Sequence, residues 1–409
     1  MPPPIMGLPK ISSLPQIVEL PCWETILRSV QQQKEWVDRV HIELTEIAAP
    51  TFHESARAEY MAERFRELGL KRVRMDAAGN LLGERAGLDK NFIGITAHLD
   101  TVVPFGSRVK VERSEGRFRA PGICDNGAGL AALLGVAAAL QESKITTDLS
   151  LLFVATVGEE GEGDLYGMRS LFSQTGICRN ARGILVLDGS SIYQTAAAGL
   201  GSRRFLVEIT GHGGHSWSDF GRVNPIHALA DAIAQLRRIT LPANPRTSLN
   251  IGMIHGGTAV NAIPHAAWMK LDIRSTSPEE IQRVSQAAEA AVRAAVEAEN
   301  QRGSGSLEAR IQPIGDRPAA ELSPSARILE VIREVDRHWG IRGRYEASST
   351  DANIPLALGI EAITIGGGGT GGDAHTPNEW YDPQGRNLGL QRILLAVLML
   401  AGIIEESKS

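Results

Sequence analysis

Carboxylate and imidazole side chains stand at the ends of several apolar runs in this sequence. The run SLLFVAT (150–156) leads directly into VGEEGEGD (157–164), which contains Glu159 and Glu160 and two further acidic residues. Four carboxylates in eight residues repel one another, and enclosing them costs solvation energy. A compensating positive charge is therefore expected opposite this segment.

Two histidines and further acidic residues follow other apolar runs. In AHLD, CDNG, VLDGS and GGDAHTPNEW they are His98, Asp100, Asp125, Asp188, Asp373 and His375. Because strand ends in an open α/β sheet converge on one crevice, we expect these side chains to lie close together. Two imidazoles with several carboxylates and no thiolate suit a borderline cation. Zinc is the first expectation, with manganese or cobalt as alternatives.

Three of these motifs, each considered by itself, are better explained by an ordinary structural role than by metal binding. His98 and Asp100 are two residues apart, so on a strand they share one face. They could be a metal ligand and the carboxylate that orients it, or a plain surface ion pair. Asp125 in DNG could cap the next helix, and Asp188 could be a turn residue. The adjacent pair Glu159 and Glu160 is harder to explain without a cation.

Three other motifs are weaker candidates for chemistry. The histidines of HGGH (212–215), at i and i+3 of a strand, point to opposite faces and are not expected to share a metal. GHSWS (214–218) lacks the final glycine of a serine-hydrolase elbow, so Ser216 is not the expected nucleophile. GGGGTGG (366–372) lacks the Lys-Ser/Thr of a phosphate loop, and a flexible loop is favoured.

The elements that must position the first group of residues alternate between helices and strands. Apolar spacing predicts helices within 22–70 and at 126–143, and strands at 92–98, 149–157 and 183–188. This alternation predicts an α/β sheet with helices on both faces.

From about residue 200 the pattern changes. Strands are expected at 203–211, 248–257, 267–274 and 306–314, with helices at 225–239 and 277–302. This βαββαβ order is that of a ferredoxin-like unit. Ser277, Pro278 and Glu280 form a capping-box pattern at the start of the second helix. A helix at 323–340, a strand at 361–367 and a helix at 388–404 then resume the first sheet, so we expect a catalytic domain over 1–199 and 316–409 with an insertion at 200–315.

Length, charge and cysteine content narrow the class of protein. With 409 residues the chain is long enough for two domains, and its net charge of −5 argues against nucleic acid or an anionic membrane as main partner. No apolar run reaches the ~20 residues of a membrane span. The first 21 residues lack a signal-peptide pattern and are expected to be an irregular leader. Three distant cysteines without CxxC favour a reducing, cytoplasmic location.

Taken in order, the motifs resemble the two-zinc metallopeptidase family 20, which includes peptidase T, glutamate carboxypeptidase and aminoacylase. The matching stretches span about residues 90–382: TAHLDTV, PGICDNGAGLAALL, VATVGEEGEGD, LVLDGS, GHGGHSW, GGTAVNAIPHAAWMKLDIR and GGDAHTPNEWYD. The resemblance implies a mixed-sheet zinc-peptidase catalytic domain with an inserted α+β, ferredoxin-like lid and dimerisation domain.

The resemblance also implies a role for each site residue. Two zinc ions per chain would supply the missing positive charge. One ion would be held by His98, Asp125 and Asp188, and the other by Asp125, Glu160 and His375. Asp100 would orient His98, and Glu159 would be the general base. Asn126 stands where many relatives have a second Asp, the Asp125–Asn126 peptide is expected to be cis, and Cys124 is expected to be an apolar neighbour rather than a ligand.

The implied activity is hydrolysis of an amide bond. Glu159 would take a proton from a water that the cations acidify, hydroxide would attack the carbonyl, and His215 would stabilise the oxyanion. Asn261 and Arg274 would hold a substrate carboxylate or carbonyl, although Arg274 could also be a plain strand-end charge. The inserted domain would pair with a copy of itself, giving a homodimer in which His215 completes the partner's site.

Within the family, TDANIPLALGIEAITIGGG (350–368) and HTPNEWYD (375–382) favour a peptidase T-like aminopeptidase acting on short peptides. The alternatives are a carboxypeptidase or an N-acyl-amino-acid deacylase with the same residues. A more distant alternative is a non-catalytic metal-binding protein. The intact Glu159 speaks against that alternative, because such a protein has no use for a general base.

Overall fold

The computed structural model describes residues 10–173 and 176–404 and divides into two compact units. The larger unit contains the described residues up to Ala198 and from Glu321 onward. The smaller unit is Gly199–Ala320. Each unit has its own apolar core and is described separately below.

A nine-stranded mixed sheet forms the centre of the larger unit. Its order is β16-β9-β18-β8-β4-β7-β3-β2, with β17 beside β9. Strands β18, β8, β4 and β7 are parallel, while β3 and β9 run antiparallel to their neighbours β7 and β18. The bounds are β2 Lys71–Met75, β3 Leu81–Arg85, β4 Asp89–His98, β7 Leu149–Thr156, β8 Ala181–Leu187, β9 Gln194–Gly199, β16 Ala320–Glu321, β17 Arg344–Ser348 and β18 Ala362–Ile365.

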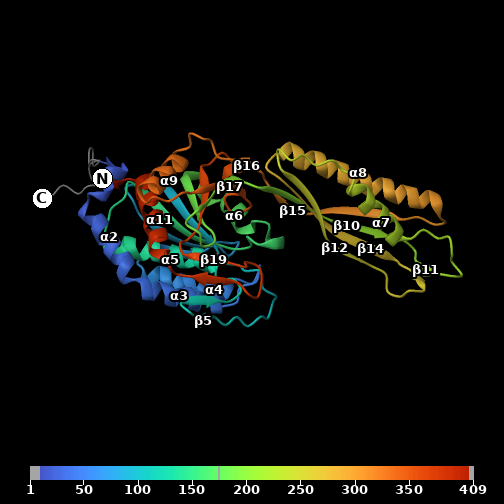
Figure 1. The fold of residues 1–409 in the computed structure, drawn as a ribbon, viewed down its shortest axis with the longest axis horizontal. Coiled ribbons are helices and arrows are strands. Elements are labelled where there is room, and N and C mark those ends of the chain that lie inside the picture. The colour runs from blue at the N-terminus through green and yellow to red at the C-terminus, as the bar shows by residue number, and fades with distance from the viewer. Residues whose placement is uncertain (1–9, 174–175, 405–409) are drawn as a thin grey trace. The chain divides into compact units, whose positions relative to one another are not determined.

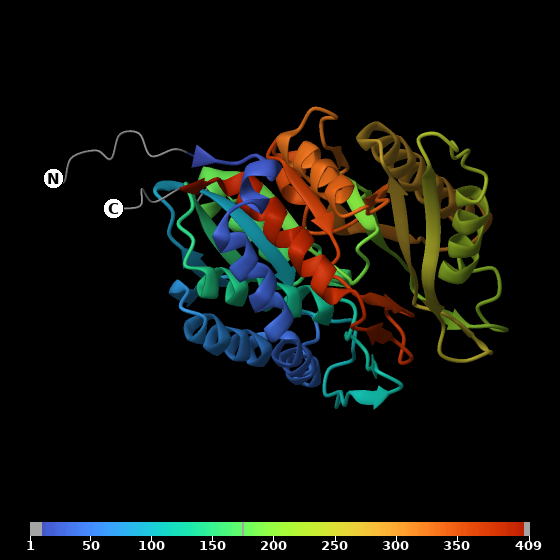
Figure 2. The same cartoon turned by 60° about the vertical axis from the view of Figure 1, so that its left-hand side comes forward.

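Helices cover both faces of this sheet. Leu152 and Val154 of β7 pack against α6 and α10, while Phe153 points to the other face, where its ring meets Phe65 of α4. Helix α5 is apolar all round because it lies between β4 and the outer helices α2, α3 and α11. Figure 2 shows α11 beside α2. The helix bounds are α1 Leu14–Val18, α2 Pro21–Gln32, α3 Lys34–Glu46, α4 Ser55–Glu67, α5 Gly127–Ser143, α6 Tyr166–Leu171, α9 Arg327–His338, α10 Asn353–Ala357 and α11 Arg386–Ala401.

The expected helices and core strands of this unit are confirmed, whereas several short elements were not foreseen. The hairpin β2–β3 extends the sheet, and a small sheet of order β19-β20-β6-β5 lies apart from it. Its strands are β5 Glu112–Ser114, β6 Arg117–Arg119, β19 Thr370–Gly372 and β20 Trp380–Asp382. These strands are short and largely exposed on at least one face, so they carry little apolar periodicity to detect.

The expectation of an irregular leader is wrong for the described part of the N-terminus. Strand β1 (Lys10–Ile11) pairs antiparallel with β21 (Ile403–Ile404), and α1 follows it. Ile11, Leu14 and Ile17 are buried, which explains why this segment is ordered against the body of the unit. The part of the predicted leader at 1–9 lies outside the described residues.

The smaller unit is a four-stranded antiparallel sheet with two helices on one face (Figure 1). Its order β12-β14-β10-β15 is that of the ferredoxin-like unit, which confirms the βαββαβ prediction. Alternate residues of β10 and β14 form its core with α7 and α8. The bounds are β10 Gly201–Thr210, β11 Gly214–His215, α7 Pro225–Leu236, β12 Thr247–Gly256, β13 Ala262–Ile263, β14 Ala266–Ser275, α8 Pro278–Arg302 and β15 Glu308–Arg317.

The capping box predicted for α8 is only half formed. The Ser277 hydroxyl accepts a hydrogen bond from the Glu280 N–H (3.2 Å), as expected. The Glu280 carboxylate does not return to the Ser277 N–H but pairs with Arg283 at 2.8 Å. The Ser277 N–H donates instead to the Ser275 hydroxyl (3.1 Å).

In the described part of the chain, no helix combines the length and the apolar character that crossing a lipid bilayer requires.

Candidate active site

Three adjacent parallel strands end at the same edge of the large sheet. His98 is the last residue of β4 and lies opposite Thr156, the last residue of β7, while β8 ends at Leu187 on the other side of β4. The segments that follow these strands therefore leave the sheet side by side. They carry Asp100, the Glu159–Glu160 pair and Asp188, so the predicted convergence of the strand ends is observed.

His98 faces two carboxylates from different segments. Its Nε2 atom lies 3.1 Å from Asp125 Oδ1 and 3.6 Å from Asp188 Oδ1. Its side chain is 2% exposed, so these contacts are enclosed. The three residues form a group of one nitrogen and two oxygen donors that could hold a metal ion.

A second group of donors shares Asp125 with the first. His375 Nε2 lies 3.1 Å from Asp125 Oδ2 and 2.9 Å from Glu160 Oε1. The two oxygens of Asp125 thus face two different histidines. Zinc–ligand bonds of about 2.0–2.2 Å place ligand atoms of a tetrahedral site about 3.3–3.6 Å apart, close to the separations in both groups. The donor set therefore fits two neighbouring divalent cations.

The electrostatics of the two groups favour positive charge between the donors. Burial opposes protonation of His98, but hydrogen bonds to the surrounding carboxylates outweigh it and raise its pKa well above the usual range. Hydrogen bonds to Asp125 and Glu160 raise the pKa of His375 to about 10. Burial raises the pKa of Asp188, because little solvent reaches its carboxylate. Divalent cations would neutralise these carboxylates without requiring either imidazole to carry a proton.

Asp100 holds the loop that carries the two glutamates. Its Oδ1 and Oδ2 atoms accept the backbone N–H groups of Glu159 (3.0 Å) and Glu160 (2.9 Å). His98 Nδ1 lies 3.0 Å from the Asp100 carbonyl oxygen and 3.5 Å from its carboxylate. Asp100 was predicted to orient His98. Its carboxylate oxygens lie closer to the backbone nitrogens of Glu159 and Glu160 than to His98 Nδ1.

The loop turns sharply before the two glutamates. Gly158 has φ +61°, a conformation that side chains rarely adopt, and its N–H donates to Glu54 Oε1 (3.0 Å). Glu159 is 4% exposed, and a carboxylate oxygen of it lies within 4.8 Å of ligand atoms of both His98 and Glu160. Glu159 is therefore placed beside the donor groups, in a position from which it can accept a proton.

Glu379 is an important site residue that the sequence did not reveal. It is 1% exposed, and its carboxylate accepts the backbone N–H groups of Gly122 (2.7 Å), Cys124 (2.7 Å) and Asp125 (2.8 Å). These bonds fix the segment that ends in the shared carboxylate of Asp125. The sequence signal was limited to an acidic residue in NEW, four positions after the candidate ligand His375, and the partners of Glu379 lie more than 250 positions away.

Asn126 joins the start of α5 to the end of β8. Its side-chain oxygen accepts from the Gly129 N–H (3.1 Å), and its amide nitrogen donates to the Leu187 carbonyl (2.9 Å). Asn126, rather than Asp125, is therefore the cap of α5, which leaves Asp125 available as a ligand. The Asp125–Asn126 peptide is cis, as predicted.

Cys124 is a buried thiol rather than a donor in either group. Its Sγ donates to the Ser190 hydroxyl (3.2 Å), and burial raises its pKa to about 12. The three groups of possible metal ligands among the described residues contain no cysteine. This agrees with the expectation that Cys124 is an apolar neighbour of Asp125.

Three further residues with a predicted role, His215, Asn261 and Arg274, belong to the smaller unit. His215 is exposed in β11, and its Nδ1 accepts the backbone N–H groups of Trp217 (3.2 Å) and Ser218 (3.4 Å). The backbone carbonyl of Asn261 accepts the Ser216 N–H (3.0 Å). Arg274 lies in β14, and its Nε donates to Asp272 (2.7 Å).

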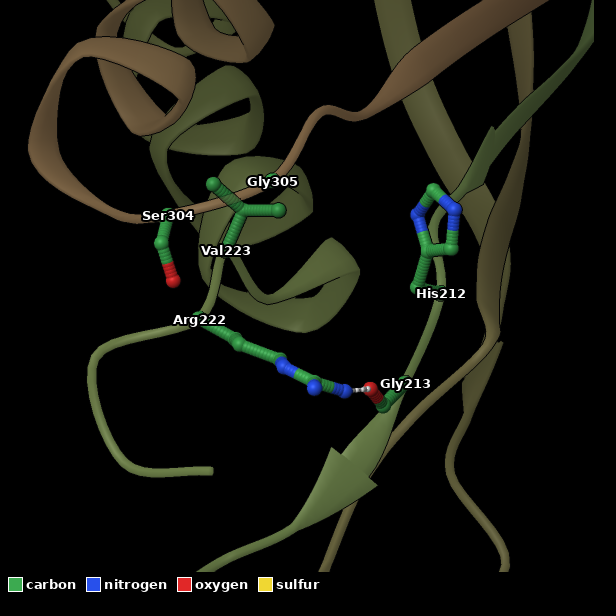
Figure 3. A pocket seen from close by; sticks show the side chains of 6 residues that line it. All are labelled: His212, Gly213, Arg222, Val223, Ser304 and Gly305. Atoms are coloured by element: carbon green, nitrogen blue, oxygen red, sulfur yellow. Dashed lines mark hydrogen bonds between the residues drawn. The ribbon is translucent and has the colours of Figure 1, made fainter.

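A separate pocket of about 240 Å³ lies within the smaller unit (Figure 3). It is lined by His212 of HGGH, together with Gly213, Arg222, Val223, Ser304 and Gly305. The guanidinium of Arg222 is committed, because it donates to the Gly213 carbonyl (3.0 Å) and pairs with Asp219 (2.9 Å).

Comparisons with known proteins agree with this geometry. The model of peptidase family M20/M25/M40 matches residues 94–406. A tripeptidase from Staphylococcus aureus is 25% identical, with a TM-score of 0.75 over 90% of this chain and 98% of its own. The protein YqjE of Bacillus subtilis is 26% identical over 90% of this chain and 96% of its own length. A probable carboxypeptidase of Ajellomyces capsulatus is 26% identical over 58% of this chain and 60% of its own length.

Proposed function

Because the chain belongs to peptidase family M20/M25/M40, we propose that it hydrolyses amide bonds of short peptides at a centre of two metal ions. The position of the Asp125 carboxylate supports this most directly. Its two oxygens each lie 3.1 Å from a different histidine, His98 and His375, as a carboxylate shared by two cations requires.

We assign the two groups of donors to two ions of zinc, with manganese or cobalt as alternatives. One ion would be held by His98, Asp125 and Asp188, and the other by Asp125, Glu160 and His375. When bound, the cations supply positive charge that polarises a peptide carbonyl and makes a nearby water more acidic.

Glu159 is assigned as the general base, which takes a proton from the attacking water and passes it to the leaving amine. Its burial and its place beside both donor groups suit this role. Asp100 is assigned as a positioning residue, since its carboxylate accepts the N–H groups of both glutamates. These bonds would fix the backbone from which the base Glu159 and the ligand Glu160 project.

His215 is assigned as the donor to the oxyanion. Because its Nδ1 accepts two backbone N–H groups, the neutral imidazole carries its proton on Nε2, where it can be donated outward. Arg274 and Asn261 are assigned to a substrate carboxylate or carbonyl. The Nε of Arg274 is engaged with Asp272, which leaves its other guanidinium nitrogens for a ligand.

The smaller unit is proposed as a lid and dimerisation domain. Strand β12 lies at the edge of its sheet, and edge strands readily pair with a second copy. Met253 and Ile254 of β12 are exposed, as are three large apolar side chains in loops of the same unit: Trp217, Phe220 and Val260. In such a homodimer, His215 would serve the site of the partner chain. A cytoplasmic location remains part of the proposal.

Within the family, an aminopeptidase acting on di- and tripeptides is our first choice. The similarity to the S. aureus tripeptidase over nearly the whole chain favours it. A carboxypeptidase or an N-acyl-amino-acid deacylase is the second candidate, favoured by the similarity to the A. capsulatus probable carboxypeptidase.

The test is to follow amino acids released from Met-Gly-Ala by the chelator-treated protein, before and after adding zinc. An aminopeptidase releases methionine first, whereas a carboxypeptidase releases alanine first. N-acetyl-methionine, added in parallel, identifies a deacylase. Absence of release from all of these substrates in zinc, manganese and cobalt would refute the proposed function.

A further inference from the structure

A second cavity, of about 520 Å³, lies within the larger unit and has a basic lining. Its walls are formed by Ser191, Tyr193, Gln194, Arg342, Arg344 and Gly371. The lining thus contains two guanidinium groups, a phenol, a hydroxyl and an amide, and it contains no carboxylate. We call this cavity the Arg342–Arg344 pocket.

The pocket lies at the sheet edge that carries the candidate active site. Ser191 follows Asp188 by three residues, a stretch that spans at most about 11 Å when fully extended. Gly371 packs so closely against Cys124 that an added Cβ would lie 2.5 Å from its Sγ, and Cys124 precedes the shared ligand Asp125. The pocket is therefore within the reach of a short peptide whose scissile bond lies at the two donor groups.

The side chains of Arg342 and Arg344 are available to bind a ligand. Among the described residues, neither guanidinium has a hydrogen-bond or ion-pair partner, and both side chains are exposed. Arg222 in the pocket of Figure 3 differs, because both Gly213 and Asp219 already engage it. Two free guanidinium groups in one concave site favour an anionic ligand, and their fork of N–H groups matches a carboxylate.

The segment that carries the arginines is held in place from below. The Arg344 N–H donates to the Tyr193 carbonyl (2.6 Å), and the Ile341 N–H donates to the Asp336 carbonyl (2.8 Å). The carboxylate of Asp336 is itself paired with the buried Arg392 at 2.6 Å. Because its carboxylate is paired with Arg392, Asp336 does not engage Arg342 or Arg344.

We propose that the Arg342–Arg344 pocket binds a carboxylate of the peptide substrate, so that a peptide with this carboxylate binds more tightly than its uncharged amide counterpart. The inference rests on the proposed function for the identity of the ligand. The carboxylate has two sources, an acidic side chain or the chain terminus, and the experiment separates them. The lining residues Tyr193 and Ser191 offer further donors to the same group.

Binding is measured by calorimetry on the full-length, zinc-loaded Glu159→Gln variant, so that no turnover interferes. The ligands are Glu-Ala-Ala, Ala-Glu-Ala and Ala-Ala-Glu, each against its Gln counterpart, and Ala-Ala-Ala against its C-terminal amide. We expect at least one acid to bind about tenfold more tightly than its neutral partner, equivalent to about 1.4 kcal/mol. In the Arg342→Gln/Arg344→Gln double variant this ratio should fall to about one.

The control is Arg66→Gln/Arg182→Gln, which removes the same charge. Arg66 lies on α4, and Arg182 lies at the opposite end of β8 from Asp188. This control should keep the acid preference, and an Arg342→Lys/Arg344→Lys variant should keep part of it. Thermal unfolding confirms that each variant is folded.

The outcomes are decisive in both directions. If only the pocket variant loses the preference for the acid over its neutral partner, the inference is supported. The peptide that shows this loss then identifies whether the bound carboxylate is a side chain or the chain terminus. Equal binding of acids and neutral partners, or survival of every acid preference in the pocket variant, overturns it. Failure of the proposed function is seen separately, as absence of peptide hydrolysis by the unsubstituted protein.

Discussion

At the residue scale, Glu159 and Glu160 are neighbours in sequence with different surroundings. Glu160 Oε1 lies 2.9 Å from His375 Nε2, within a donor group that contains Asp125. Glu159 lies beside the donors without being part of either group that shares Asp125. The two residues are therefore expected to respond differently to the same substitution.

Glu159→Gln should keep both metal ions and lose most turnover. A positioned general base contributes about 10²–10⁴-fold to the rate, so kcat should fall by that factor. Elemental analysis of the purified variant gives the metal content, and peptide hydrolysis gives kcat. Glu162→Gln, an exposed change in the same loop, is the matched control and should retain activity. Loss of one ion per chain from Glu159→Gln would mean that the roles of the two glutamates are exchanged.

Glu379→Gln should weaken metal binding although Glu379 is not a ligand. The carboxylate accepts three backbone N–H groups, and an amide replaces one acceptor oxygen with a donor that faces them. Loss of such a supporting contact typically costs 10–100-fold in metal affinity. Competition with a chelator measures the affinity, and Glu142→Gln at the exposed C-terminal end of α5 is the control. Unchanged affinity in Glu379→Gln would show that Asp125 does not depend on this support.

At the scale of single elements, the start of α8 depends on Ser277 more than on Glu280. Ser277→Ala removes the acceptor for the Glu280 N–H and should lower the free energy of unfolding by about 1 kcal/mol. Glu280→Gln should have a much smaller effect, because its carboxylate reaches only the exposed Arg283. Urea titrations of both variants test this order. Equal losses would indicate a closed capping box in solution.

The contact between α3 and α11 should make stability depend on pH through His41. His41 Nε2 donates to the Ile123 carbonyl (2.6 Å), and its Nδ1 accepts from Arg386 (2.5 Å). Burial first, and then the charge of Arg386, lower the pKa of His41 well below its usual value. The unfolded chain therefore binds a proton below about pH 6.5 that the folded chain excludes, so stability falls as the pH falls.

The size of this effect follows from comparing the protein with His41→Gln, whose amide can both donate to Ile123 and accept from Arg386. Between pH 6.5 and 5.5 the unsubstituted protein should lose about 1 kcal/mol more of its free energy of unfolding than the variant does. Urea titrations at several pH values measure the difference. Parallel pH profiles of the two proteins would contradict this account of His41.

At the scale of the whole molecule, the proposed homodimer predicts complementation between inactive chains. A His215→Ala chain keeps the metal ligands, and a Glu159→Gln chain keeps His215. If His215 serves the partner's site, the mixed dimer has one site with both changes and one with neither. Its activity should then return toward half of that of the unsubstituted dimer.

Mass spectrometry under native conditions shows whether mixed dimers have formed, and peptide hydrolysis measures their activity. Each parent alone should be nearly inactive. Mixed dimers that stay as inactive as their parents would place His215 in its own chain's site or outside catalysis. A single-chain mass at all concentrations would refute the dimer itself, and the exposed Trp217 and Phe220 would then need another explanation.

Features with a local signal were predictable from the sequence alone. The buried parallel strands β4, β7 and β8 are continuous apolar runs, and the βαββαβ order of the smaller unit follows from local periodicity. The residue types at the strand ends indicated the donor chemistry, because convergence at one sheet edge is a general property of such sheets.

Tertiary structure alone decided which atoms meet. Glu379 binds a segment about 255 residues away, Asn126 rather than Asp125 caps α5, and Asp336 pairs with Arg392 beneath the Arg342–Arg344 pocket. Periodicity reports which residues are buried, but it does not report which distant partner a buried carboxylate finds. That choice depends on how the strand ends and the surrounding loops pack, so the support of the site and its neighbouring pocket could be recognised only in three dimensions.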